Sequence, residues 1–285
     1  MNVIEFRQFF KRNGEFTLKN LNFPIHSGYI TGLIGPNGSG KTTLIRSIMN
    51  LIRPDSGEVL VFDQSYRNKE RDIKRRIGFV YDEDFFYNHL TLNEMKKIVS
   101  SFYPSWNETA FRKYLDDFQL PARRIVRDLS KGMKTKFALA AALAHEPDLL
   151  IMDEPTSGLD PVFRREVLSI LSEYIHEGTR SVLFSTHIST DLERIADYIV
   201  YIRRGQLRFC GSKEELIDSY VLVKGPSEWL RTTRFENTFL GLQQSALGFE
   251  ALVAKASYSE EAFGNQVIVE KPSLDDILFY TREEK

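Results

Sequence analysis

A short glycine-rich segment constrains the fold of this chain more than any other part of its sequence. It reads Gly35, Pro36, Asn37, Gly38, Ser39, Gly40, Lys41, Thr42. An apolar run precedes it and a helical pattern follows, so its N–H groups can surround an anion at the start of a helix. Lys41 is placed to reach nucleotide phosphates, and the Thr42 hydroxyl to bind Mg²⁺. An ordinary turn is the alternative interpretation, and this context disfavours it.

Two adjacent acids end the apolar run at residues 149–152. In open parallel sheets, ligands bind at the carboxyl ends of the strands. Asp153 is therefore predicted to hold Mg²⁺, directly or through water, and Glu154 to polarise an attacking water. The second acid favours transfer of the phosphoryl group to water over its transfer to a bound acceptor. Alone, such a pair commonly just begins a loop, but the phosphate-binding pattern upstream supports the functional interpretation.

Ser130 opens a further predicted helix, at residues 130–145. Serine is a good N-cap, and the N-terminus of the helix offers N–H groups to an anion. On this segment alone, an ordinary helix cap is the simpler interpretation.

The rest of the chain alternates strands and helices, which predicts a parallel sheet with right-handed crossovers. The predicted strands are 28–34, 58–62, 77–81, 149–152, 181–185, 198–203 and 206–210, and the predicted helices are 41–51, 93–103, 108–119, 130–145 and 161–176. Residues 2–9 and 16–25 predict an antiparallel hairpin with a bulge, because the apolar phase slips. After about residue 216 the pattern stops, and strands at 220–223 and 266–269 predict a small α/β domain.

Composition narrows the class of protein. Lysine plus arginine total 38 and the acids total 39, whereas a nucleic-acid binder is usually basic. We therefore expect no nucleic-acid partner. The single cysteine, Cys210, cannot form an internal disulfide. We expect neither a signal peptide nor a membrane-spanning helix, which needs ~20 apolar residues, so a membrane function would require a separate subunit.

Five elements in order resemble the ATPase cassettes of ABC transporters. They are the phosphate loop at 35–42, the signature at 129–133, the acids at 153–154, residues 157–160, and His187. The resemblance covers roughly residues 2–217 and implies an α/β P-loop NTPase core with a parallel sheet. It also implies an N-terminal antiparallel β subdomain and a helical insert at about 88–134. Residues 218–285 are then a small C-terminal accessory domain.

The resemblance implies ATP and Mg²⁺ as cofactors. Lys41, Glu154 and His187 would be catalytic, with His187 contacting the γ-phosphate, and Thr43 would bind ATP together with the phosphate loop. A lone histidine is more often structural, but its place in this order favours the functional role.

The resemblance also implies a head-to-tail pair of cassettes. Each ATP would lie between one phosphate loop and the signature of the partner, so Ser130 and Gly132 would act in trans. Asp160 would lie in the loop that communicates between the two sites. The second cassette could be identical or related.

Two departures concern the signature and the adenine contact. Lys131 and Met133 replace glycine and glutamine of the usual signature. An aromatic residue that stacks on adenine is expected near position 13, where Asn13 stands instead. Phe10 or Phe16 could substitute for it.

A third departure lies after the strand at 77–81, where Asp82 replaces the glutamine of the family. A carboxylate there would repel the γ-phosphate unless Mg²⁺ lay between them. We therefore expect Asp82 to face the metal when the site closes. The alternative is that Asp82 turns outward and caps the helical insert.

The resemblance implies an integral membrane permease as partner, and a cytoplasmic position at the inner face of the cell membrane. Residues 84–87 are rich in aromatics and lie where the family docks its permease, although they could equally pack on the helical insert. Residues 28–32, 131–134 and 272–277 resemble a bacterial exporter-type subgroup that moves amphipathic or peptide-like compounds.

Two other functions are open. One is a soluble ABC ATPase that acts on ribosomes or DNA, but such proteins usually carry two cassettes or a long coiled coil, and residues 43–128 lack heptads. The other is a regulatory cassette without transport, against which intact Lys41, Asp153 and Glu154 argue.

Overall fold

The computed structural model describes residues 1–82, 85–176, 178–232, 238–264 and 266–281. The chain divides into two compact units. The first contains residues 1–187 and 195–210, and the second contains residues 188–194 and 211–285. The residues that directly follow His187 are thus grouped with the C-terminal part of the chain. The division of the sequence into 1–217 and 218–285 stays a prediction.

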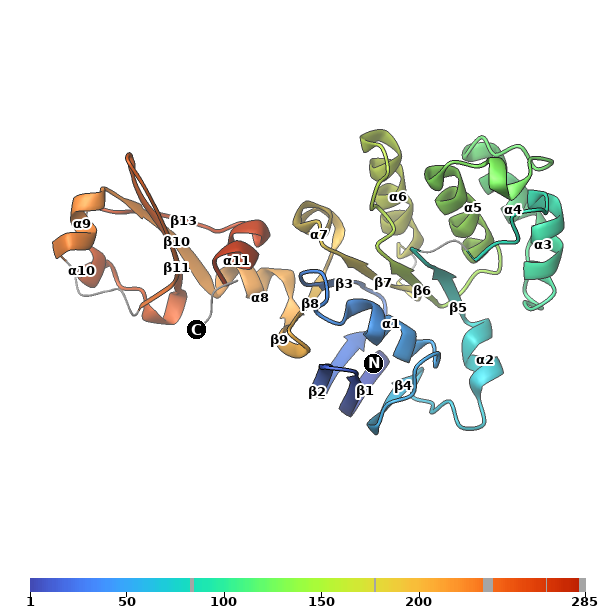
Figure 1. Ribbon diagram of the computed structural model, residues 1–285, viewed down its shortest axis with the longest axis horizontal. Helices are drawn as coiled ribbons and strands as arrows, with labels where there is room; N and C mark the ends of the chain where they lie inside the picture. The colour runs from blue at the N-terminus through green and yellow to red at the C-terminus, as the bar shows by residue number, and fades with distance from the viewer. Residues whose placement is uncertain (83–84, 177, 233–237, 265, 282–285) are drawn as a thin grey trace. The chain divides into compact units, whose positions relative to one another are not determined.

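A six-stranded sheet in the order β5-β6-β7-β3-β8-β9 forms the centre of the first unit (Figure 1). Its strands are β3 (Ile30–Ile34), β5 (Ile77–Val80), β6 (Leu149–Asp153), β7 (Ser181–Thr186), β8 (Tyr198–Arg203) and β9 (Gln206–Ser212). All pairs from β5 to β8 are parallel. Every residue of β3 and β6 is buried, which explains why both lack the alternation of a half-buried strand. The predicted α/β fold is confirmed.

A three-stranded antiparallel sheet, in the order β2-β1-β4, completes the strands of the first unit. Its strands are β1 (Asn2–Asn13), β2 (Phe16–His26) and β4 (Ser56–Val61). The predicted bulge lies where the pair Phe9–Leu21 gives way to the pair Lys11–Leu18. Between them, Asn20 has a left-handed backbone with φ 46. The slip in apolar phase therefore marks a real irregularity of the hairpin.

The helices of the first unit are α1 (Lys41–Ile48), α2 (Glu70–Arg75), α3 (Leu92–Ser100), α4 (Glu108–Asp117), α5 (Lys131–Leu143) and α6 (Pro161–Tyr174), with a 3₁₀ turn η1 (Val126–Asp128). Four of them, α3 to α6, begin at side chains that accept backbone hydrogen bonds. Thr91, Asn107, Ser130 and Asp160 cap α3, α4, α5 and α6. Helices α3, α4 and α5 lie together (Figure 1), and α5 continues to Leu143, beyond residue 134 where the predicted helical insert ends. In the described part of the chain, no helix is long and apolar enough to cross a membrane.

The second unit is built on a four-stranded antiparallel sheet in the order β11-β12-β10-β13. Its elements are α7 (Ser189–Ile195), α8 (Lys213–Asp218), β10 (Tyr220–Gly225), α9 (Ser227–Thr232), β11 (Phe239–Ser245), β12 (Gly248–Ala254), η3 (Lys255–Ser257), α10 (Glu260–Phe263), β13 (Ile268–Glu270) and α11 (Leu274–Tyr280). From β10 to β13 this is a split β-α-β arrangement. Trp229 stacks on Phe249 and Phe263, with ring centroids 5.3 and 5.6 Å apart.

The segment 272–277, which the sequence singled out, joins α11 to α7 within the second unit. Ser273 and Asp276 form a capping box at the start of α11. The Ser189 hydroxyl donates to Asp275 Oδ1 at 2.8 Å, and the backbone N–H of Leu274 donates to Glu193 Oε1 at 2.6 Å. The helix that follows His187 is therefore fixed to the C-terminal helix by polar contacts.

Candidate nucleotide site

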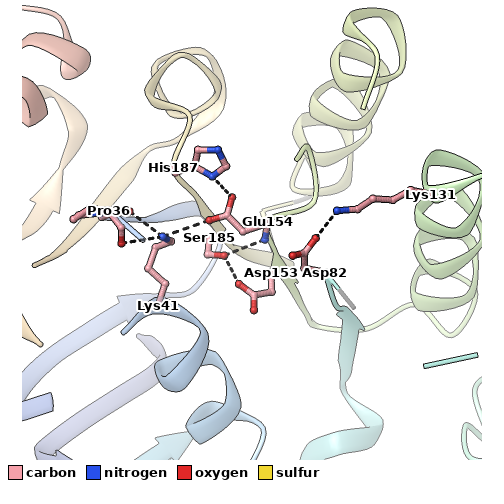
Figure 2. A network of polar contacts seen from close by, with 9 residues as sticks. Pro36, Lys41, Asp82, Lys131, Asp153, Glu154, Ser185 and His187 are labelled. Carbon is pink, nitrogen blue, oxygen red and sulfur yellow. Dashed lines mark hydrogen bonds and ion pairs between the residues drawn. The ribbon is translucent and has the colours of Figure 1, made fainter. Parts of the chain in front are cut away.

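The phosphate loop lies between β3 and α1, as its sequence predicts. Gly40 precedes the helix with φ 111, and an added Cβ there would lie 2.5 Å from the Leu18 side chain. Only glycine meets both conditions without strain. The Lys41 side chain is 6% exposed, and its ammonium donates to the carbonyl oxygen of Gly35 at 2.8 Å (Figure 2). The loop thus presents its N–H groups and one ammonium at the same place.

Asp153 ends β6 and is 2% exposed. The Ser185 hydroxyl, from the neighbouring strand β7, donates to Asp153 Oδ1 at 2.5 Å (Figure 2). Burial raises the pKa of Asp153, while hydrogen bonds from Ser185 and Thr42 oppose that rise. Thr42 and Asp153 are therefore neighbours, as predicted. A hydroxyl and a carboxylate beside a phosphate site are suitable Mg²⁺ ligands.

Glu154 lies at the centre of a polar network (Figure 2). Its Oε1 lies 3.4 Å from the Lys41 ammonium, and its Oε2 lies 2.7 Å from His187 Nδ1. Its backbone N–H donates to the Ser185 hydroxyl at 3.0 Å. Its φ of 50 is left-handed, a conformation that non-glycine residues adopt mostly in turns and at functional sites. The structure therefore brings together Lys41, Glu154 and His187, the three predicted catalytic residues.

Ser185 was missed by the sequence interpretation. It is fully buried in β7, yet its hydroxyl contacts both Asp153 and the backbone of Glu154. The signal was weak but present, because Ser185 and Thr186 follow an apolar run at the same end of the sheet as the acids.

A pocket of about 610 Å³ opens over the phosphate loop. Its lining residues are Asn13, Phe16, Asn37, Gly38, Ser39, Gly40, Lys41, Thr42, Thr43, Asp82, Glu154, Ser157 and His187. Phe16 contributes to this lining and Phe10 does not, which distinguishes the two aromatic candidates. Ser130, Gly132 and Asp160 are also absent from the lining. Ser130 and Gly132 therefore do not face the pocket that the phosphate loop of the same chain forms.

Ser130 of the signature and Asp160 act as helix caps in this chain. The Ser130 hydroxyl accepts from the N–H of Met133 at 3.3 Å. Asp160 Oδ1 accepts from the N–H groups of Val162 and Phe163, both at 3.0 Å. The bond from Phe163 is the main cause that lowers the pKa of Asp160, and the bond from Val162 adds to it. The simple capping interpretation holds within the chain, and it leaves the trans role of Ser130 untested.

Asp82 lines the pocket, but its carboxylate pairs with a residue of the signature. Lys131 Nζ lies 2.9 Å from Asp82 Oδ1 (Figure 2). The two charged departures from the family pattern are therefore in contact. The predicted metal-facing orientation stays a prediction, because the carboxylate here contacts the first residue of α5.

A second pocket, of about 480 Å³, lies on the other side of Asp82. It is lined by Phe79, Tyr81, Asp82, Phe85, Phe86, Lys131, Lys134, Thr135 and Ala138, and is called the aromatic groove below. Of the aromatic segment, Asp84 lies outside the described residues. Phe86 packs on Phe137, with centroids 4.9 Å apart, while Phe85 and Tyr87 are 66% and 56% exposed. Packing on the helical insert and exposure for a partner therefore both occur.

Comparisons with known proteins identify the family of this chain. The model of the ABC transporter family matches residues 18–157. ABC transporter ATP-binding protein YtrB of Bacillus subtilis is 30% identical over 263 residues, which span 92% of this chain and 90% of that protein. Bacitracin transport ATP-binding protein BcrA of Enterococcus faecalis is 35% identical over 208 residues, spanning 72% and 68% of the two chains.

A solved structure of an ATP-binding subunit of an ABC transporter matches with a TM-score of 0.70 and 26% identity. The match covers 76% of this chain and 92% of that one. This chain belongs to the family of ABC transporter ATP-binding proteins. It is an ATP-binding subunit that hydrolyses ATP, as the resemblance implied.

Proposed function

We propose that this chain works as one of two cassettes that close around ATP and drive a separate membrane permease. One observation carries the proposal. The pocket contains the network of Lys41, Glu154 and His187, whereas Ser130 and Gly132 of the same chain do not line it. ATP in this pocket would leave one side open, and the signature of a second cassette would complete the site. The partner cassette is identical or related.

The residues of the pocket have distinct roles in hydrolysis. The loop N–H groups and Lys41 bind the phosphates, and Lys41 exchanges its contacts with Glu154 and carbonyl oxygens for phosphate oxygens. Glu154 then accepts a proton from the attacking water, while His187 orients its carboxylate. Thr42 and Asp153 would hold Mg²⁺, which would neutralise the charge of the phosphates.

Phe16 is the proposed contact for the adenine ring. It lines the pocket beside Asn13, at the end of the loop where the base would emerge. An added Cβ on Gly40 would lie 3.0 Å from the Phe16 ring, which shows how closely the ring approaches the phosphate loop. Aromatic faces bind bases regardless of sequence.

The aromatic groove is the proposed docking site for the permease, with Phe85 and Tyr87 exposed near it. The chain would then lie on the cytoplasmic side, peripheral to the membrane. BcrA is described as a bacitracin transport protein, so we propose that the cargo is an amphipathic or peptide-like compound and that transport is export. The second candidate function is action on ribosomes or DNA, and no feature of the aromatic groove favours it.

The test separates the role of the phosphate pocket from that of the signature. Glu154→Gln should bind Mg-ATP but hydrolyse it ~10²–10⁴-fold more slowly, because the positioned base is lost. ATP should then shift this variant from monomer to dimer in size-exclusion chromatography. Adding Ser130→Arg to the same chain should leave ATP binding intact and prevent the shift. A double variant that still dimerises, or that loses ATP binding, would contradict the trans role of Ser130.

A further inference from the structure

Asp82 and Lys131 form an ion pair at the edge of the phosphate pocket. The two residues carry opposite charges and are 49 residues apart in sequence. Either residue alone would place an unpaired charge beside the phosphate pocket. Together they form an ion pair of 2.9 Å and no net charge.

The position of the pair connects two pockets. Asp82 lines both the phosphate pocket and the aromatic groove, and Lys131 lines the groove. Asp82 thus forms part of the wall between them. Its charge also acts on the metal side of the site: burial is the main cause that raises the pKa of Asp153, and the charge of Asp82 raises it further.

The exposure of the pair argues against a role in stability. The side chains of Lys131 and Asp82 are 55% and 41% exposed. Ion pairs in water of this kind contribute little to folding, because solvent screens them and both side chains lose freedom. A contact that stabilises so little can be broken and remade at low cost, and its effect on nearby charges is then its main consequence.

We propose that Lys131 is a positioning residue for the metal–nucleotide site, which holds the Asp82 carboxylate at the edge of the phosphate pocket and cancels its charge there. This rests on the proposed function, since it assumes that the pocket binds ATP with Mg²⁺. Without Lys131, the free carboxylate attracts the metal and repels the nucleotide. Without Asp82, the free ammonium does the opposite.

The test is a double-mutant cycle on nucleotide binding by the isolated chain. Wild type, Asp82→Asn, Lys131→Met and the double variant are titrated with ATP in a series of Mg²⁺ concentrations, by calorimetry. Lys131→Met should weaken ATP binding at saturating Mg²⁺ and lower the Mg²⁺ concentration for half-maximal binding. Asp82→Asn should change both quantities in the opposite direction, each by roughly three- to tenfold. The double variant should return to within about twofold of wild type.

Several outcomes would overturn the inference. Single variants that change binding in the same direction would indicate a structural role. A Lys131→Met effect that persists in the Asp82→Asn chain would mean that Lys131 acts on nucleotide without Asp82. Lys41→Ala, with thermal unfolding as a check of folding, controls for the assumption: if wild type binds ATP no better than Lys41→Ala, the proposed function fails and not the pairing of Asp82 with Lys131.

Discussion

The phosphate pocket and its edge each contain a lysine beside a carboxylate, but the two pairs differ in their exposure to solvent. Lys41 and Glu154 are 6% and 14% exposed and have further hydrogen-bond partners, whereas Asp82 and Lys131 are 41% and 55% exposed and pair at 2.9 Å. Removing one buried partner leaves a desolvated charge, which is costly. Removing an exposed partner leaves a charge that water can solvate. The buried pair therefore suits a site whose geometry is fixed, and the exposed pair suits a contact that can break and form again.

The largest effect is expected from removing the buried lysine of the phosphate pocket. Lys41→Ala should abolish the stabilisation by ATP, which for wild type reaches about 2.7 kcal/mol when ATP is at 100 times its dissociation constant. Thermal unfolding with and without Mg-ATP measures it. Lys19→Ala, at an exposed position of β2, is the control and should keep the full stabilisation. Equal stabilisation of Lys41→Ala would show that Lys41 does not hold phosphate.

The buried half of the site was also the half that the sequence predicted. Gly35 to Thr42 and Asp153 with Glu154 are contiguous patterns that end or begin a regular element, so local sequence determines where they lie. The pairing of Asp82 with Lys131 depends on how β5 and α5 pack, and no local pattern encodes a contact between such distant residues. Ser185 was missed for the same reason, because its partners are on another strand.

Prediction of the fold also succeeded where local sequence decides the element and failed elsewhere. Strands of the first unit were predicted within a few residues, because buried parallel strands are continuous apolar runs. Helix α1 ends at Ile48 and not near residue 51, since Asn50 adopts a left-handed backbone with φ 54. In the second unit, neither β11 nor β12 was predicted. The last four residues of β11 are exposed and three of them are polar. In β12, three consecutive buried residues at 251–253 break the alternation of a half-buried strand.

A buried histidine outside the nucleotide site tests whether burial alone makes a charged side chain costly. His145 is 2% exposed, stacks on Tyr103 with ring centroids 3.8 Å apart, and has Nε2 at 3.2 Å from the Ile77 carbonyl oxygen. Burial lowers its pKa below 6.5. Below about pH 6.5 the unfolded chain takes up a proton that the folded chain does not. The free energy of unfolding therefore decreases as the pH is lowered, by up to ~1.4 kcal/mol per pH unit.

Denaturant unfolding between about pH 7 and pH 5 measures this contribution. His145→Phe keeps the aromatic stack but cannot be protonated, so the part of the pH dependence due to His145 should disappear. His89→Asn, an exposed position, controls for the loss of a histidine as such. An unchanged pH dependence in His145→Phe would show that this ring is protonated equally in both states.

The smallest effect is expected from the exposed pair, and it decides whether the comparison holds. Asp82→Asn and Lys131→Met should each change the free energy of unfolding by less than about 1 kcal/mol, with a coupling of ~0.2–1 kcal/mol between them. Urea unfolding of the four chains at low salt and at ~1 M salt measures both, and the coupling should vanish at high salt, where the Debye length is ~3 Å. A coupling of several kcal/mol that survives salt would mean that the pair is desolvated and holds β5 to α5. Lys131 would then be a structural residue, and any change in nucleotide binding would follow from a displaced helix and not from the charge of Asp82.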